Sequence, residues 1–222
     1  MIRPSCKTIF FDLDGTLVDS APDLATSVNH ALASIDKPSI CDDTLRTYIG
    51  NGADRLIHRA ITRDFHGIAD ETVYEPGRQA FLNHYATNVC DKSKLYPTVR
   101  ETLDTLASKK YELACITNKP AQFTLPLLKS LNIEHFFDLI LSGDTLERKK
   151  PAPDQLVFAA KHFNREPSSC LMVGDTTTDI SAALNFTAPA VFVTYGYGQI
   201  SDLDKRFQGP HIDEMAELLR HL

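Results

Sequence analysis

The chain has 222 residues, of which 43% are hydrophobic, enough to bury a sizeable core in one large domain or two smaller ones. Its formal net charge of −6 gives no overall reason to bind nucleic acid or an anionic membrane, so neither is expected as a partner. No apolar stretch approaches the roughly 20 residues that cross a bilayer, and the cysteines are scattered without a Cys-x-x-Cys pair. We expect a soluble, cytoplasmic protein; its composition says nothing of oligomeric state.

The first predicted element is a buried strand over residues 8–13, which ends in an acidic motif. Asp12 and Asp14 lie two residues apart, so in a strand their side chains point to one face and can enter one pocket. Gly15 permits the chain to bend as it leaves the sheet. Two carboxylates about 4 Å apart repel by roughly 4 kcal/mol at an effective dielectric near 20. The pair needs a proton, a cation or a reaction to compensate it, and therefore indicates a functional site.

The next segment, residues 19–96, contains no convincing strand. Apolar residues at helical spacing predict amphipathic helices over residues 24–35, 53–62 and 72–89. We therefore expect a helical cap domain over residues 19–96, inserted after the first strand and lying over the strand ends. Residues 1–18 and 97–222 would form the catalytic core.

In the rest of the chain, short apolar runs alternate with helix-like segments. Buried strands are predicted over residues 113–116, 139–141, 170–173 and 190–193, and helices over residues 98–108, 120–130, 153–163 and 176–184. This alternation predicts an α/β fold, with helices on both faces of a parallel sheet. In such sheets the ligand site lies beyond the carboxyl ends of the strands.

Three further polar motifs follow predicted strands. Thr117 and Asn118 can donate hydrogen bonds to a phosphate oxygen, although by themselves they fit an ordinary helix cap better. Lys150 can offset carboxylate repulsion and bind a phosphate, although the basic run around it also fits a solvated turn. Asp175 and Asp179 lie one helical turn apart, and their oxygens suit Mg²⁺, although one could be a cap and the other a surface residue.

The position of these motifs argues for one site. Each lies at or just past the carboxyl end of a strand in one parallel sheet, and independent decorations would rarely share that edge. We therefore expect the motifs to bind a metal ion and a small phosphorylated metabolite.

With these motifs the chain resembles the haloacid dehalogenase superfamily, and within it the bacterial phosphoglycolate phosphatases. Its segments are similar to the superfamily's four motifs in order: residues 12–20, Thr117 with Asn118, Lys150 with its prolines, and Gly174 with Asp175 and Asp179. The narrower likeness rests on residues 48–54, 116–120 and 194–198. The resemblance spans nearly the whole chain and implies a Rossmann-like, doubly wound parallel sheet with an inserted α-helical cap.

The resemblance also implies catalytic and metal-binding roles. Asp12 would be the nucleophile that forms an aspartyl-phosphate, and Asp14 would protonate the leaving alkoxide and then activate water. Mg²⁺ would be held by a carboxylate oxygen of Asp12, the main-chain carbonyl of Asp14, and Asp175, with Asp179 in support.

Substrate binding is implied for a second group of residues. Thr117, the amide of Asn118 and Lys150 would hold the phosphoryl oxygens. The expected substrate, 2-phosphoglycolate, also carries a carboxylate, so a cation should descend from the cap, and Arg55 is the expected residue. The implied reaction is Mg²⁺-dependent hydrolysis to glycolate and phosphate.

Two departures from the family's pattern leave room for another substrate. Ala152 stands where many relatives have histidine between the prolines of the third motif, and residues 182–186 lack the expected alanine–glycine ending. A pyrophosphatase, a sugar-phosphate phosphatase or a β-phosphoglucomutase of the same superfamily therefore stays open. A receiver-type phospho-accepting signalling module is a further alternative, against which the long helical segment and Asp14 argue.

Overall fold

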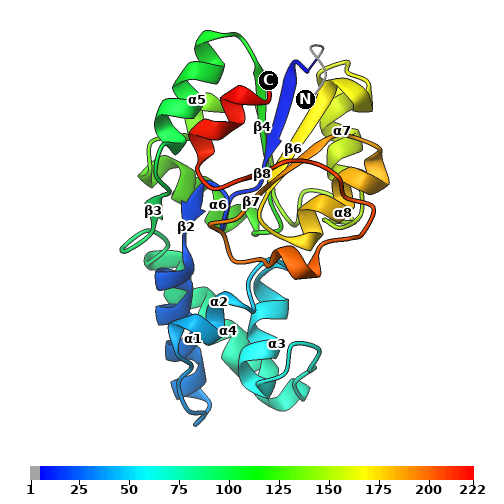
Figure 1. Ribbon diagram of the computed structural model, residues 1–222. Helices are drawn as coiled ribbons and strands as arrows, with labels where there is room; N and C mark the ends of the chain where they lie inside the picture. Colours follow the sequence, from blue (N-terminus) through cyan, green and yellow to red (C-terminus); the bar gives the residue numbers. More distant parts are fainter. Residues whose placement is uncertain (1–5) are drawn as a thin grey trace.

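The computed structural model describes residues 6–222, and Figure 1 shows a sheet flanked by helices, with a smaller group of helices beyond one end of the strands. The sheet has six parallel strands in the order β5-β4-β1-β6-β7-β8. They are β1 (Thr8–Phe11), β4 (Glu112–Ile116), β5 (Leu139–Leu141), β6 (Cys170–Gly174), β7 (Ala190–Val193) and β8 (His211–Ile212). The predicted α/β fold is confirmed, and β1, which leads into the acidic motif, lies inside the sheet.

Successive residues of each strand face opposite sides of the sheet, and each side buries its own apolar layer. Ile9 and Phe11 belong to one layer, together with apolar residues of α5 (Val99–Ser108) and α6 (Ala121–Ser130). Phe10 belongs to the other, with α7 (Asp154–His162) and α8 (Thr177–Phe186). Burial on both faces explains why these strands read as continuous apolar runs in the sequence.

Four helices lie between β2 and β3 in the chain: α1 (Ala21–Ser34), α2 (Asp42–Arg46), α3 (Ala53–Thr62) and α4 (Glu71–Thr87). They form the lower part of Figure 1, where α1 and α4 pack together. The helices predicted over residues 24–35, 53–62 and 72–89 correspond to α1, α3 and α4. Helix α2 has only five residues, too few for an apolar period to show in the sequence.

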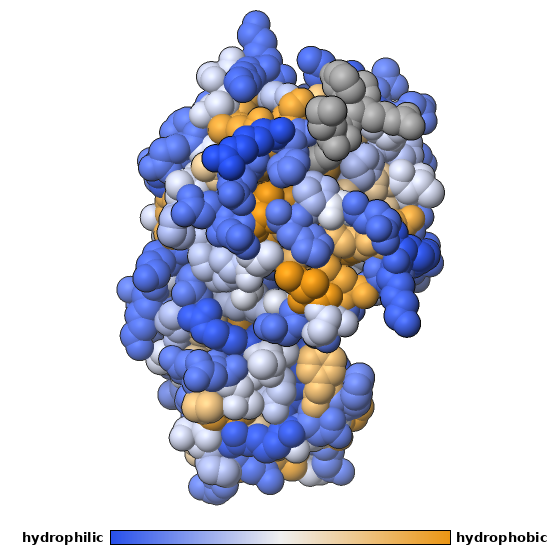
Figure 2. Space-filling model, viewed as in Figure 1, coloured by the Kyte–Doolittle hydropathy of each residue, from blue (hydrophilic) through white to orange (hydrophobic). Residues whose placement is uncertain are grey.

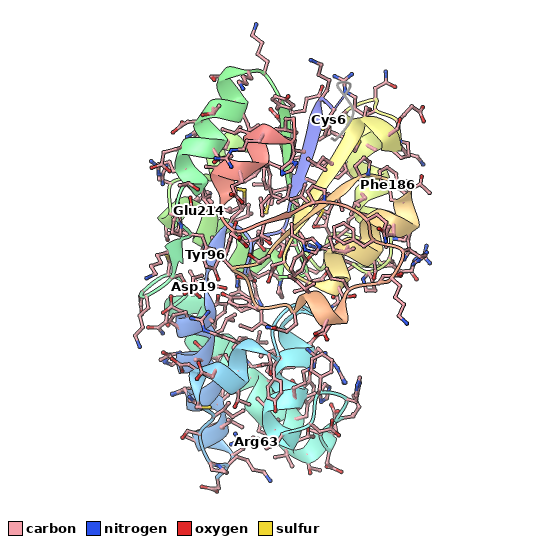
Figure 3. All side chains as sticks on the ribbon, viewed as in Figure 1. Cys6, Asp19, Arg63, Tyr96, Phe186 and Glu214 are labelled. Atoms are coloured by element: carbon pink, nitrogen blue, oxygen red, sulfur yellow. The ribbon has the colours of Figure 1, made fainter. Side chains whose placement is uncertain are left out.

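The two crossings between the sheet and these helices lie side by side. β2 (Val18–Asp19) and β3 (Lys94–Leu95) pair as antiparallel strands. Asp19, labelled at this junction in Figure 3, accepts hydrogen bonds from Arg46 at 2.9 and 3.1 Å and from the Tyr197 hydroxyl at 3.1 Å. Because the chain enters and leaves the helical part at one place, we propose that residues 19–96 form the cap domain.

The face of the molecule drawn in Figure 2 is mostly hydrophilic, with apolar residues in small separate areas. Its outline is notched on one side, between the sheet part and the helical part. Cys115 and Cys170 are free and buried, as expected from their apolar surroundings. Among residues 6–222 no helix combines the length and the apolar character needed to span a membrane.

Candidate active site

The carboxyl ends of β1, β4 and β6 bring the sequence motifs to one edge of the sheet. Asp12 directly follows β1, and its backbone N–H donates to the carbonyl of Val173 in β6 at 3.0 Å. Gly15 has a φ of +88°, and a Cβ at this position would collide with the Asp175 carboxylate. Only glycine combines this backbone conformation with so close an approach, so Gly15 permits the bend as predicted.

Asp12, Asp175 and Asp179 form a cluster of buried carboxylates, named here the metal cluster. One oxygen from each lies within 4.8 Å of the corresponding oxygens of the other two. Asp175 is held in place by the hydroxyl of Thr16, which donates at 3.0 Å, and by the N–H of Tyr197, which donates at 2.8 Å. Converging carboxylate oxygens are hard ligands, so the cluster can hold a divalent metal ion.

Burial controls the protonation of this cluster. Burial and the charge of Asp179 raise the pKa of Asp12 to about 7, although Lys150 acts in the opposite direction. Burial, Asp179 and Asp12 likewise hold the pKa of Asp175 well above its usual range. One lysine does not neutralise three carboxylates, so a bound divalent cation fits this donor set electrostatically as well as chemically.

Lys150 lies between two carboxylates of the cluster. Its Nζ is 2.8 Å from Asp12 Oδ1 and 2.6 Å from Asp179 Oδ1, and it also donates to the carbonyl of Ile116 at 2.6 Å. Burial disfavours the charge, but the two carboxylates outweigh burial and raise the pKa of Lys150 above its usual range. The structure thus brings Lys150 to the acidic residues; its contact with a phosphoryl group stays a prediction.

Thr117 and Asn118 follow β4 at the same edge, but their side chains already have partners in the protein. Thr117 Oγ1 accepts from the N–H of Lys119 at 3.1 Å. Asn118 Nδ2 donates to the carbonyls of Gly50 at 3.1 Å and Lys150 at 2.9 Å. The Asn118 side chain therefore joins the loop before α3 to the loop before α7. Phosphate binding by either residue stays a prediction.

The side chain of Asp14 is not among the three carboxylates of the metal cluster. Its carboxylate accepts from Ser20 Oγ at 2.5 Å and from Lys119 Nζ at 3.1 and 3.2 Å. Lys119 also donates to the Tyr85 hydroxyl at 2.7 Å, and its side chain is only 3% exposed. A role of Asp14 toward the metal through its main-chain carbonyl stays a prediction.

Sequence reasoning missed Lys119 and Tyr85. Lys119 had a signal, because it directly follows Asn118 in a motif already singled out. Tyr85 had none, because a tyrosine at helical spacing in α4 looks like any other buried position of an amphipathic helix.

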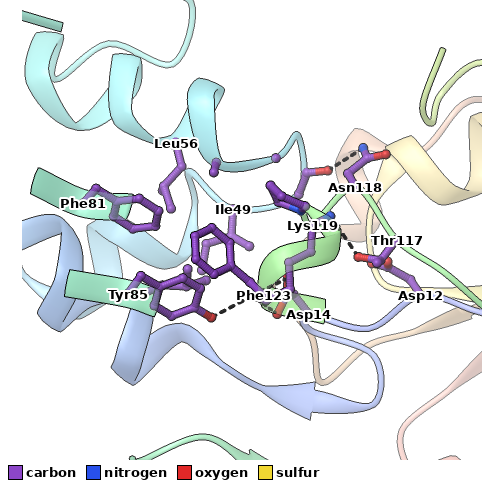
Figure 4. A pocket seen from close by; sticks show the side chains of 15 residues that line it. Asp12, Asp14, Ile49, Leu56, Phe81, Tyr85, Thr117, Asn118, Lys119 and Phe123 are labelled. Atoms are coloured by element: carbon purple, nitrogen blue, oxygen red, sulfur yellow. Dashed lines mark hydrogen bonds and ion pairs between the residues drawn. The ribbon is translucent and has the colours of Figure 1, made fainter. Parts of the chain in front are cut away.

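A small pocket lies next to these residues, between the strand ends and the helices (Figure 4). Its polar side includes Asp12, Asp14 and Lys119. Its apolar wall is formed by Leu24, Ile49, Leu56, Phe81 and Phe123. The space open to the centres of water-sized molecules is ≈ 40 Å³, against about 10–15 Å³ for one water. The pocket in this conformation therefore admits only a small molecule.

The structure does not bring Arg55 to this pocket. Its guanidinium donates to the carbonyls of Phe65 at 3.0 Å and Gly67 at 3.1 Å, and it lines a separate, outer hollow. The neighbouring residue, Leu56, lines the pocket, and consecutive helical residues point about 100° apart. The helical phase of α3 therefore turns Arg55 outward, and its contact with substrate stays a prediction.

The loop after β7 completes the site. The sequence leaves open whether residues 195–198 lie near the site or form a plain edge loop. Tyr197 donates its N–H to Asp175, and its hydroxyl accepts from the N–H of Ser20 at 2.9 Å. Gly196 lies so close to Asp175 that a Cβ would overlap the Asp175 side chain. The loop is therefore part of the wall that positions the metal cluster.

Comparison with known proteins identifies the class to which this fold and site belong. The model of the family described as haloacid dehalogenase-like hydrolase matches residues 9–193, which include Asp12, Asp14, Asp175 and Asp179. The chain therefore belongs to the haloacid dehalogenase-like hydrolases.

More specific likenesses extend along nearly the whole chain. The phosphoglycolate phosphatase of Colwellia psychrerythraea is 42% identical over 217 residues, which cover 96% of this chain and 95% of that protein. The phosphoglycolate phosphatase of Nitrosococcus oceani is 40% identical over 212 residues, covering 96% and 94%. A crystal structure described as a predicted phosphoglycolate phosphatase from Haemophilus somnus matches with a TM-score of 0.90 and 36% identity over 97% of each chain.

Proposed function

We propose that this chain is a Mg²⁺-dependent phosphomonoesterase that hydrolyses 2-phosphoglycolate to glycolate and phosphate. The observation that carries the proposal is the position of Asp12, which belongs to the metal cluster, contacts Lys150 and lines the small pocket together with Asp14. Relatives named phosphoglycolate phosphatase favour this substrate. The small pocket also favours a two-carbon ester over a hexose phosphate or a nucleotide.

In the proposed reaction, a carboxylate oxygen of Asp12 attacks phosphorus, and the bond from phosphorus to the ester oxygen breaks. Asp14 gives a proton to the leaving oxygen and then takes one from the water that cleaves the aspartyl-phosphate. Ser20 and Lys119 orient the Asp14 carboxylate for both proton transfers. Phosphoryl transfer depends mainly on such positioning and on charge neutralisation.

The proposed metal ligands are Asp12, Asp175 and Asp179, with the main-chain carbonyl of Asp14. When bound, Mg²⁺ supplies positive charge beside the phosphoryl oxygens. Lys150, from the third motif, adds a second positive charge next to Asp12. The apolar wall of the pocket limits the access of bulk water. Thr117 and the amide of Asn118 would donate hydrogen bonds to the phosphoryl group.

Phosphate release from a panel of metabolites, with and without Mg²⁺, tests this function. The panel contains 2-phosphoglycolate, hexose phosphates, nucleotides and pyrophosphate. We expect Mg²⁺-dependent release with a strong preference for 2-phosphoglycolate. A different preference would retain the phosphatase chemistry and contradict the substrate, whereas no release from any compound would contradict the function.

A further inference from the structure

The small pocket is lined by a cation, Lys119, to which the proposed reaction gives no contact with substrate. Of the residues that line it, Lys119 is the only one with a positive charge, and Asp12 and Asp14 are the only ones with negative charges. The remaining lining residues are apolar or neutral. A charged group at the wall of an otherwise apolar pocket determines which ligands the pocket accepts.

Lys119 is buried but has only one ionic partner among residues 6–222. Its Nζ is 3.1 Å from Asp14 Oδ1, and its other contact is the neutral hydroxyl of Tyr85. Its side chain lines the pocket (Figure 4), so its ammonium group can contact a ligand that enters this space.

Three other cations near the site do not line the small pocket. Lys150 contacts Asp12 and Asp179 within the metal cluster. Arg55 donates to two backbone carbonyls and lines the outer hollow, and Arg46 is paired with Asp19 at the junction. Among the described residues Lys119 is thus the cation that lines the pocket itself, whereas Lys149, whose Nζ lies beside Gly52, lines the outer hollow.

We propose that Lys119 binds the carboxylate of the substrate, so that the site selects phosphomonoesters whose carboxylate lies one carbon from the ester oxygen. This inference rests on the proposed function and adds a specificity-determining residue to it.

The spacing follows from the contact between Lys119 and Asp14. In the proposed reaction the ester oxygen lies within hydrogen-bond reach of Asp14, about 2.6–3.2 Å. The ammonium group of Lys119 is 3.1 Å from the same carboxylate. Both contacts involve the same Asp14 carboxylate, and the single methylene of 2-phosphoglycolate places its carboxylate within reach of Lys119 while the ester oxygen contacts Asp14. The small volume of the pocket disfavours a longer spacer.

Tyr85 extends this recognition to the helical part. Its hydroxyl accepts from Lys119 at 2.7 Å, and the ammonium group lies 4.7 Å from the centre of its ring. Helix α4 carries Tyr85, whereas Lys119 lies in the loop between β4 and α6. The proposed carboxylate site is therefore assembled from both parts of the molecule.

The test compares kcat/KM for 2-phosphoglycolate and 2-hydroxyethyl phosphate, in which a neutral CH₂OH replaces the carboxylate. Lys119→Met removes the charge, and Lys119→Gln does so while it keeps a hydrogen-bond donor for Asp14 and Tyr85, in case the methionine variant does not fold. Lys129→Met is the matched control, because Lys129 lies on α6 with its side chain 64% exposed. Any disturbance of Asp14 affects both substrates and cancels in the ratio of the two kcat/KM values.

We expect the wild-type preference for 2-phosphoglycolate to fall roughly 30-fold or more in both Lys119 variants, as for loss of one partner of a buried charge pair. Lys129→Met should leave the preference unchanged. An equal loss for both substrates would overturn the proposal and leave Lys119 as a residue that only positions Asp14. Loss of the preference in Arg55→Ala but not in the Lys119 variants would overturn it as well.

Calorimetric titration separates this proposal from the proposed function. The Asp12→Asn variant should bind 2-phosphoglycolate, and adding Lys119→Gln should weaken that binding without changing the binding of 2-hydroxyethyl phosphate. This pattern would support the carboxylate site even if the wild type released no phosphate. Binding that does not depend on Lys119 would overturn the proposal even if the wild type were an active phosphatase.

Discussion

The region around Lys150 and the region around Lys119 both bury a lysine against a carboxylate, but the partners come from different places. Lys150 contacts Asp12, Asp179 and the carbonyl of Ile116, all in the sheet part of the molecule. Lys119 contacts Asp14, which follows β1, and Tyr85, which belongs to the helical part. The groups that contact Lys150 therefore all come from one part, whereas the groups that contact Lys119 come from both.

Substitution of Asp12, the proposed nucleophile, should have the largest effect, because it removes the atom proposed to react from the Lys150 region. We expect Asp12→Asn to lower kcat for every substrate by roughly 10³-fold or more. The protein should stay folded, because the neutral amide avoids the cost of a buried charge at this position. Asp104→Asn on the exposed side of α5 is the control for steady-state assays and circular dichroism. Activity close to wild type would contradict the assignment of Asp12.

Loss of Lys150 should damage stability and all activities together. In Lys150→Met, Asp12 and Asp179 lose their shared cation, which should lower the free energy of unfolding by about 3–5 kcal/mol. Denaturant titration measures this change, with Lys161→Met on the exposed side of α7 as the control. The ratio of kcat/KM values for 2-phosphoglycolate and 2-hydroxyethyl phosphate should not change, in contrast to the Lys119 variants. A fall in kcat/KM for only one of the two substrates would contradict the proposed difference between Lys150, which acts on all substrates, and Lys119, which selects among them.

The metal cluster should make stabilisation by Mg²⁺ depend on pH. Asp12 has a pKa raised from 3.8 to about 7 in the folded chain, so between these values the folded state without metal holds a proton that the unfolded state has lost. The free energy of unfolding without metal therefore falls as pH rises through this window. At a pH below about 7, Mg²⁺ must displace the proton on Asp12 in order to bind. The increase in melting temperature on adding Mg²⁺ should be larger at about pH 8 than at about pH 5.5. Equal increases at both pH values would contradict this linkage.

The smallest expected effect lies in the contribution of the helical part to the Lys119 region. Tyr85→Phe removes the hydroxyl that accepts from Lys119 at 2.7 Å but keeps the ring. We expect kcat/KM for 2-phosphoglycolate to fall about fivefold, the equivalent of one hydrogen bond of about 1 kcal/mol. Tyr111→Phe, just before the amino end of β4, is the control. An equal fall for 2-hydroxyethyl phosphate would show that Tyr85 does not take part in selection.

Sequence patterns predicted the parallel sheet well because its strands are buried on both faces. The strand expected over residues 170–173, for example, corresponds to β6, and the polar residues after it do lie at the site edge. Strands β2, β3 and β8 have only two residues each, and pairing between distant short segments leaves no local pattern. Their absence from the prediction has this physical cause.

The residues of the candidate site likewise fall into those that sequence patterns could place and those that they could not. Asp12, Asp175 and Asp179 could be placed together because a strand fixes where its carboxyl end lies. The partner of Asp14 could not be predicted, since it depends on the direction of Lys119 in a loop. The position of Arg55 depends on the phase of α3, where a shift of one residue exchanges an outward side chain for one in the pocket.

The antiparallel pairing of β2 with β3 has a consequence for how Tyr85 reaches Lys119. Two separate linkers would let the helices drift in many directions, but two strands joined by backbone hydrogen bonds form one short tether with few degrees of freedom. The tether keeps Tyr85 at a high effective concentration beside the loop that carries Lys119. Mechanical stiffness at the junction would thereby support the selectivity proposed for the pocket, although the β2–β3 pair lies outside the residues that line it.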